Sequence, residues 1–405
     1  MELATREMRE REERPGRAGE RIGGKTRDIP AVDVARFVCA LLVVAIHVRP
    51  LSTYTELGNF LLDKGLCRIA VPFFFLVSGY FWARKPLTLR SLGAFLWRIA
   101  LLYALWTAIY YPIVTESQDM NHYWRRCLLS GSYYHLWYYP AMFVAAVLTF
   151  AAWKCFAGDG SGKAGKSGRG GESASRGKAG GAVVIVAFLF YFIGCMGESY
   201  YGLFAQNARI VELAEAYFAL FWSTRSGLFF GFFFFALGVF LQKSRWRMGR
   251  PAAAVALAVS LGLMFLEIMT LRRLGVAKDY NLYFALIPAT LFLFLFLMGR
   301  PEEMDDSGRN GCAAGSWRLW LFLRRSSVLI YGIHLWCKYY GLKYANSVLA
   351  GAVGLVDGTL VRMADLFVNN SMAQYGMICA ASFLFAVVVL ALQRIPILRF
   401  LKYLY

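Results

Sequence analysis

Two side chains in one apolar stretch near the N-terminus are of types that perform chemistry. The stretch from Asp33 to His47 reads D-V-A-R-F-V-C-A-L-L-V-V-A-I-H, with a charge pair at its start and an imidazole at its end. Arg36 and His47 are eleven residues apart, which on an α-helix places both on one face, about 16 Å apart along the axis. Because ionisable groups inside an apolar helix are costly, this pair is interpreted as functional.

The chemistry of the pair follows from the two residue types. A histidine titrates near neutral pH and can take a proton from a hydroxyl group. An arginine binds phosphate or carbonyl oxygens through a planar fork of N–H donors. The pattern therefore indicates a catalytic histidine above an anion-binding arginine. The alternative is an arginine that reaches to the membrane surface and an interfacial histidine that only forms hydrogen bonds.

The composition indicates an all-α integral membrane protein. The chain has 405 residues, of which 58% are hydrophobic and 17% charged, and its mean hydropathy is +0.47. Repeated windows of eighteen or more residues carry almost no charge, which is typical of membrane-spanning helices. Ten spans are predicted, leaving no room for a sizeable soluble domain: 31–50, 66–83, 95–114, 134–153, 182–197, 226–242, 252–271, 281–299, 327–345 and 374–393.

The distribution of charge predicts how these spans are oriented. The formal net charge is +19, and most of the 44 Lys and Arg residues fall in cytoplasmic segments if the N-terminus is inside. The positive-inside rule therefore places both termini in the cytoplasm. It also accounts for the charge without a nucleic-acid partner, for which there is no motif. In this orientation Arg36 lies in the inner leaflet and His47 in the outer one.

The membrane domain is predicted over 28–399. A tail is expected at each of its ends, and one linker and two external segments are expected within it. Residues 1–27 form a basic, disordered cytoplasmic tail without a signal peptide, and residues 400–405 form a cytoplasmic C-terminus. A Gly/Ser/Lys-rich stretch, 158–181, has the composition of a flexible linker. External segments are expected at 198–224, with an amphipathic helix candidate A-R-I-V-E-L-A-E-A-Y-F-A-L-F, and at 346–373, which would shape an acceptor-binding mouth.

Four motifs in order along the chain resemble the membrane-bound acyltransferase family 3. Asp33, Arg36 and His47 are similar to its opening D-x-x-R and histidine, and R-I-A-V-P-F-F-F-L-V-S-G-Y-F from Arg68 to Phe81 is similar to its second segment. Y-H-L-W-Y-Y from Tyr134 and S-V-L-I-Y-G-I-H-L-W from Ser327 resemble two further motifs. The resemblance covers both ends of the chain, and the expected number of spans agrees with it.

The resemblance implies acyl transfer, usually of acetyl, from cytoplasmic acyl-CoA to a hydroxyl on the far side of the membrane. Acceptors in such proteins are cell-surface glycans or lipid-linked sugars, and the setting is a plasma membrane, here a bacterial cytoplasmic membrane. His47 would act as general base or assist acyl delivery, and Arg36 would bind the donor. Acyl-CoA is a substrate, and neither a cofactor nor a metal is expected, because four scattered histidines without nearby carboxylates make no ligand set.

Further residues receive weaker assignments, each with a structural alternative such as ordinary positive-inside charge, an aromatic anchor or a packing kink. The predicted donor contacts are Arg90, Arg98 and Ser78; the acceptor-side candidates are His135, Trp137, Arg68 and Glu267; the structural or orienting residues are Asp33, Pro72, Gly79 and His334. Glu267 is an unexpected acid in an apolar span. It is predicted to pair with His47 or with an external arginine, Arg68 or Arg225.

Two rival functions remain open. One is a non-catalytic uptake module on the same fold, which handles an amino acid or another small molecule. The other is an unrelated secondary transporter, which would show internal repeats and interrupted helices in matching halves. Cys67 and Cys127 lie near the outer surface and are the one pair that could form a disulfide.

Overall fold

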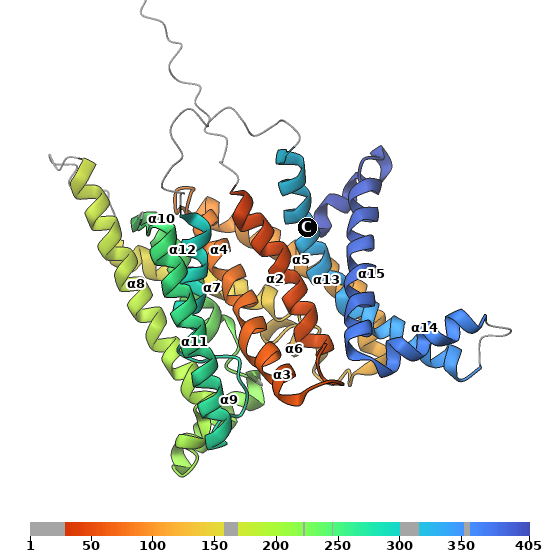
Figure 1. Cartoon of the computed structure of the whole chain (residues 1–405). Helices are drawn as coiled ribbons and strands as arrows, with labels where there is room; N and C mark the ends of the chain where they lie inside the picture. Colours follow the sequence, from red (N-terminus) through yellow and green to blue (C-terminus); the bar gives the residue numbers. More distant parts are fainter. Residues whose placement is uncertain (1–28, 158–168, 222, 245, 300–315, 352–356) are drawn as a thin grey trace, which may run out of the picture. The chain divides into compact units, whose positions relative to one another are not determined.

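The computed structural model describes residues 29–157, 169–221, 223–244, 246–299, 316–351 and 357–405, and every regular element in these ranges is helical (Figure 1). The predicted N-terminal tail and residues 158–168 of the predicted linker lie outside the described residues. The chain divides into Met1–Pro30 and Ala31–Tyr405, and the description below concerns the second unit. The all-α prediction is confirmed for the described part of the chain.

The long helices correspond to the predicted spans. Their bounds are α2 Pro30–Val48, α4 Ala70–Trp82, α5 Leu89–Ser117, α7 Tyr138–Ala157, α8 Arg169–Gly197, α10 Phe232–Ser244, α11 Arg250–Leu274, α12 Leu286–Met298, α13 Ser316–Leu349 and α15 Ser371–Leu392. Shorter helices are α3 Glu56–Phe60, α6 Tyr123–Leu129, α9 Ala208–Phe221 and α14 Gly358–Asn369, with 3₁₀ turns at Tyr201–Leu203 and Pro396–Leu404.

Within the described ranges, seven helical stretches are long and apolar enough to cross a membrane, which indicates a multi-pass membrane protein. They are α2, α5, α7, Gly177–Gly197 of α8, Gly227–Ser244, α11 and α15. The predicted second and eighth spans coincide with α4 and α12, which have only 13 residues each. The predicted ninth span falls within α13, which is long but too polar to meet the same criteria. The count of ten spans and the cytoplasmic termini therefore stay predictions.

The segment before α4 changes its helical geometry twice. A π-helix, Leu61–Gly65, is followed by a 3₁₀ turn, Leu66–Ile69, and then by α4. Pro72 is the third residue of α4, and the chain is already helical before it. A proline has no N–H to donate to the carbonyl four residues earlier, which is that of Arg68. The 3₁₀ turn that carries Arg68 lies in this upstream turn, so the irregular geometry is consistent with the packing kink considered for Pro72.

Gly79 has the close-packing role that the sequence indicated. A Cβ added to Gly79 would collide with the carbonyl oxygen of Phe235 in α10, and one added to Gly238 would collide with that of Leu76 in α4. The two helices thus approach each other backbone to backbone at a pair of glycines. This contact fixes α4 against α10.

Two of the predicted irregular segments are more helical than expected. Helix α8 already begins at Arg169, so the second half of the predicted linker 158–181 is helical. The predicted external loop 346–373 contains the end of α13 and the helix α14. The amphipathic helix predicted within 198–224 is present as α9, with the bounds Ala208–Phe221.

Helix α2 contacts three other helices at matched heights. Asp33 lies 3.9 Å from Arg324 of α13, and the His47 ring lies 5.2 Å from that of His334 further along α13. Helices α2 and α13 therefore run in the same direction. On α15, Ser371 donates to the carbonyl of Pro50 just after α2, and Phe383 packs on Phe37, so α15 runs in the opposite direction. Arg36 lies over Phe81 at the end of α4, so α4 also runs opposite to α2.

Candidate functional site

Three imidazoles meet at the C-terminal end of α2. The ring centroids of His47 and His334 are 5.2 Å apart, those of His135 and His334 are 4.9 Å apart, and those of His47 and His135 are 6.5 Å apart. The expectation of scattered histidines is therefore wrong for these three. His122, by contrast, is exposed in the turn before α6. Sequence could not show the cluster because its members come from α2, α13 and the turn before α7.

Backbone contacts hold each of these histidines in place. His334 is 0% exposed and its Nδ1 is 2.8 Å from the carbonyl oxygen of Tyr331, which fits the orienting role predicted for it. His135 Nε2 is 3.1 Å from the carbonyl oxygen of Gly332, which also accepts from the Tyr110 hydroxyl. The carbonyl of His47 accepts a hydrogen bond of 2.6 Å from Lys338 Nζ. A cation at the last carbonyls of a helix is electrostatically favourable, so Lys338 anchors the end of α2.

A cavity opens beside the His47 ring. Its polar and aromatic lining consists of His47, Arg68, His135, Trp137, Arg225, Phe230, Asn281 and Tyr331, and the remaining wall is aliphatic, with Val43, Ile46 and Val71. Three of the four acceptor-side candidates, Arg68, His135 and Trp137, therefore share one cavity with His47. Arg36 and Glu267 are not among the residues that line it.

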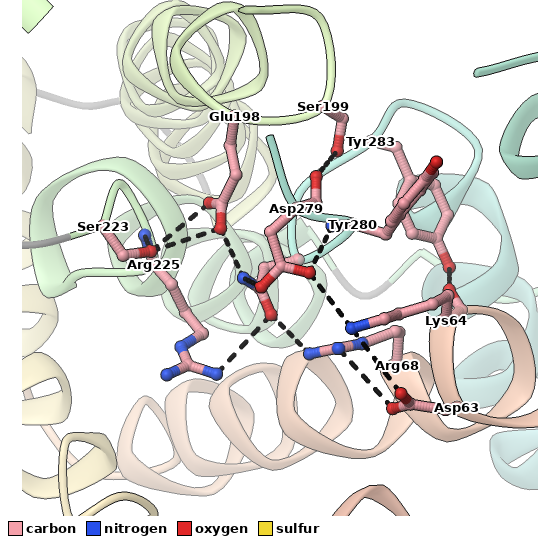
Figure 2. Close-up of polar contacts among 11 residues, drawn as sticks. Asp63, Lys64, Arg68, Glu198, Ser199, Ser223, Arg225, Asp279, Tyr280 and Tyr283 are labelled. Carbon is pink, nitrogen blue, oxygen red and sulfur yellow. Dashed lines mark hydrogen bonds and ion pairs between the residues drawn. The ribbon is translucent and has the colours of Figure 1, made fainter. Parts of the chain in front are cut away.

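Three residues of the cavity lining, Arg68, Arg225 and Asn281, belong to a polar network. Figure 2 shows its contacts. Asn281 accepts hydrogen bonds from both Arg68 and Arg225 through its amide oxygen, and its amide nitrogen donates to Glu198 and Asp279. Arg68 also lies 3.6 Å from Asp63, and Lys64 lies 3.1 Å from Asp279. In Figure 2 the guanidinium groups of Arg68 and Arg225 lie below the carboxylates of Glu198 and Asp279. Arg68, Arg225 and Asn281 are the members of the network that line the cavity, and the carboxylates are not among its lining.

The two carboxylates respond differently to this environment. Burial raises the pKa of Glu198 above its usual value, and the hydrogen bond from Asn281 only partly opposes this. Burial would also raise the pKa of Asp279, but attraction to Arg68 and Lys64 prevails and lowers it to about 2. Asp279 is therefore ionised at neutral pH and balances the cationic side of the network.

Arg36 stands at the other end of α2 within a second polar group. Its Nη1 lies 3.3 Å from the carboxylate of Asp33, which is only 2% exposed and also faces Arg324. The Arg36 guanidinium lies 5.0 Å from the ring centroid of Phe81, and Arg84 lies 4.2 Å from the same centroid. Asp33 thus has the orienting position that the sequence predicted. Three arginines gather around it and around Phe81.

The predicted donor contacts divide into two kinds. Ser78 lies within hydrogen-bonding reach of Tyr138, which in turn lies close enough to Arg36 to interact with its charge. Arg90 and Arg98 are exposed on α5 and make no hydrogen bond or ion pair with the described residues. Arg84 and Arg324, which received no role from the sequence, are the arginines that gather with Arg36.

Among the described residues, Glu267 pairs with neither a histidine nor an arginine. Its carboxylate accepts hydrogen bonds from the backbone N–H groups of Phe284 and Ala285, at 2.7 and 2.6 Å, and from the hydroxyl of Tyr200. The prediction of an acceptor-side role is therefore corrected: Glu267 caps the start of α12, where unpaired N–H groups attract a carboxylate. Cys67 and Cys127, the pair for which a disulfide was left open, are both free thiols.

Sequence reasoning missed the roles of Asn281, Lys338 and Glu198. Asn281 is a single amide at the edge of a predicted span. Lys338 and Glu198 received no role from the sequence. A useful signal was present: Lys338 follows His334 by four residues, so both lie on one face of α13. Nothing in the sequence shows that Glu198, Arg225 and Asn281 meet.

Comparison with known proteins identifies the family. An acyltransferase domain matches residues 29–391, nearly the whole chain. The chain is also 29% identical over 375 residues to an amino-acid racemase of Enterococcus faecalis, covering 91% of this chain and 46% of that protein. It is 28% identical over 305 residues to a serine/alanine racemase of Enterococcus gallinarum, covering 72% of this chain and 40% of that protein.

The chain spans less than half the length of these curated relatives. No solved structure matches it. The domain match, together with the motifs around Arg36, His47, His135 and His334, leads to one identification: the chain belongs to the acyltransferase family 3.

Proposed function

We propose that the protein moves an acyl group, expected to be acetyl, from acyl-CoA on the cytoplasmic side to a hydroxyl of an extracytoplasmic acceptor. The acceptor class is a cell-surface glycan or a lipid-linked sugar. The observation that carries this proposal is the position of His47 in a polar cavity, with Arg36 at the opposite end of the same helix. Such spacing suits a donor that enters from one side and an acceptor from the other.

The proposed reaction uses His47 as general base. It takes the proton of the acceptor hydroxyl while the hydroxyl oxygen attacks the carbonyl carbon of the thioester. A carbon–oxygen bond forms, the carbon–sulfur bond breaks, and the proton passes from the imidazole to the departing CoA thiolate. Arg36, with Arg84 and Arg324 nearby, would hold the phosphates of the donor.

The test is label transfer from radiolabelled acetyl-CoA in membranes that carry the protein. We expect label in surface glycans with the wild type and a loss of about a hundredfold or more with His47→Ala. His122→Ala is the matched control, because this histidine is exposed away from the cavity, and it should keep full activity. Equal labelling with wild type and His47→Ala, at equal protein levels, would overturn the catalytic assignment.

A second candidate function is suggested by the names of the relatives. Both are racemases of amino acids, and the chain aligns with less than half of each. A membrane domain of such a protein could supply an amino acid rather than transfer an acyl group. Proteoliposomes with the purified protein and labelled serine, without acyl donor, separate the two: accumulation inside the vesicles supports uptake, and none is expected from an acyltransferase.

A further inference from the structure

The cavity beside His47 has an unusual balance of charge on its wall. Arg68 and Arg225 both line it, whereas the carboxylates of Asp63, Glu198 and Asp279 do not. The other polar side chains of the lining carry no formal charge unless an imidazole is protonated. They include the Asn281 amide and the histidines. A solute in the cavity therefore contacts the guanidinium groups directly, whereas the carboxylates lie outside the cavity lining.

Asn281 lies between the two arginines and the carboxylates of Glu198 and Asp279, while Arg68 also faces Asp63 at 3.6 Å. Its amide oxygen accepts from both guanidinium groups, and its nitrogen donates to Glu198 and Asp279. A neutral amide oxygen satisfies a donor without cancelling its charge. Arg225 has no carboxylate within ion-pair distance among the described residues, and its guanidinium carbon lies 4.8 Å from the centroid of the Trp137 ring.

Both arginines also retain unused donors. Arg68 is only 9% exposed, and its Nε is buried without a hydrogen-bond partner in the described structure. Arg225 Nε is likewise buried without a partner in the described structure. Buried donors without partners are costly, so two of them on arginines that line one cavity point to a ligand that accepts hydrogen bonds.

The electrostatic setting reinforces this reading. Burial raises the pKa of Glu198 above its ordinary value, so burial works against the carboxylate charge that would compensate the neighbouring guanidinium groups. Apolar side chains such as Val43, Ile46 and Val71 form the remaining wall and exclude water from the charges. An anion held here would interact with the arginines at low effective dielectric constant.

We infer that Arg68 and Arg225 form an anion subsite, which binds a carboxylate or phosphate group of the acceptor while His47 faces the acceptor hydroxyl. This deepens the proposed function and rests on it for the identity of the bound molecule as the acyl acceptor. The planar fork of a guanidinium binds either a carboxylate or a phosphate. The expected ligand is therefore a hydroxyl compound that carries one of these small oxyanions.

The test measures binding without an acyl donor, using the whole protein in lipid nanodiscs. Diethyl pyrocarbonate modifies accessible imidazoles, and mass spectrometry of the His47 peptide reports its rate. The probes are glycolate, which carries a carboxylate, glycerol 3-phosphate, which carries a phosphate, and glycerol, which is neutral, all at one ionic strength set with chloride. We expect at least one of the two anions to slow His47 modification and to raise the unfolding temperature, and glycerol to do neither.

Variants of Arg225 decide whether the subsite causes the effect. Arg225→Gln should weaken protection by the anion about tenfold or more, and Arg225→Lys should recover part of it because the charge is retained. Arg362→Gln, which changes an exposed arginine of α14, is the matched control and should leave protection unchanged. The probe that protects at lower concentration identifies the carboxylate or the phosphate as the preferred group.

Three results would overturn the subsite: equal protection by glycerol, no effect of either anion on modification and unfolding temperature, or unchanged anion protection in Arg225→Gln. Failure of the acyl-transfer assay with intact, Arg225-dependent anion binding would reject the proposed function and leave the subsite standing. The two proposals are therefore separable.

Discussion

At the scale of single residues, Lys338 determines where His47 stands. It is the only side chain among the described residues that donates a hydrogen bond to the His47 carbonyl, and it reaches across from α13 to do so. Within the described part of the chain, the imidazole ring packs against the rings of His135 and His334. The position of the proposed base therefore depends on a residue with no part in the chemistry.

The first prediction concerns this anchor. Lys338→Met removes the hydrogen bond and lets the end of α2 shift, so we expect kcat to fall about tenfold with little change in KM for acetyl-CoA. Lys343→Met is the matched control on the same helix, because Lys343 pairs with Glu116 away from the cavity. Steady-state acyl-transfer kinetics check the prediction. An effect on KM alone would contradict a positioning role.

The second prediction concerns Asp33. Asp33→Asn keeps the shape of the side chain but removes the charge that faces Arg36 and Arg324, so the arginines lose their orientation. We expect KM for acetyl-CoA to rise about tenfold, with kcat largely retained. Asp365→Asn, an exposed acid of α14, serves as control. A changed kcat with an unchanged KM would place Asp33 outside donor binding.

At the scale of elements, the packing of α4 on α10 depends on two glycines facing opposite carbonyl oxygens. Gly79→Ala would push a methyl group into the backbone of Phe235, which cannot move aside as a flexible side chain would. We predict a loss of about 3 kcal/mol of stability or a failure to accumulate in the membrane. Gly262→Ala in α11 is the control, since no atom lies within 4 Å of its added Cβ.

The measurement for this third prediction is thermal unfolding in detergent, followed by tryptophan fluorescence. Gly262→Ala should match the wild type or exceed it slightly, because alanine favours helix over glycine. A Gly79→Ala protein as stable as the wild type would show that the helices can separate without cost.

The elements differ in how well sequence predicts them. Helix α9 follows from its apolar periodicity, and the close approach at Gly79 follows from the small pair Ser78-Gly79. The sequence did not predict the helical start of α8, because its Gly- and Ser-rich composition resembles a linker. It also could not identify Glu267 as a cap of α12, because an acid in an apolar span looks functional whatever its partner is.

At the scale of the whole molecule, the candidate site is assembled from segments that are far apart in the chain. Arg36 and His47 could be predicted from sequence as a pair, because their spacing along a single helix places both on one face. Arg225 and Asn281 could not, because they meet Arg68 only after the chain has folded back several times. Motifs identify the residues that a helix places in order, whereas contacts between distant segments need the structure.

Stability as a function of pH tests the network as a unit. Attraction to Arg68 and Lys64 lowers the pKa of Asp279 to about 2, against its ordinary value of 3.8. A lowered carboxyl pKa contributes stability above the unfolded value, and the contribution is lost as the pH falls through the folded value. Because the side chain is 40% exposed, we discount the contribution to about 1 kcal/mol.

The fourth prediction follows from this sign. Wild type should exceed Asp279→Asn by about 1 kcal/mol between pH 5 and pH 7, and the difference should shrink between about pH 4 and pH 2. Unfolding midpoints of the two proteins in detergent across this range give the comparison. A difference that grows on acidification would show that Asp279 is not held ionised by the cations.

The rigid connection between Arg36 and His47 has one more consequence. Both are part of the same helix, so the distance between the two ends cannot shorten, and α2 acts as a ruler of about 16 Å. An acyl group bound at the Arg36 end reaches His47 only if it is carried on a long, flexible arm. A compact donor such as acetyl phosphate would be held by the same arginines yet remain out of reach, and the protein would discriminate between donors by length rather than by reactivity.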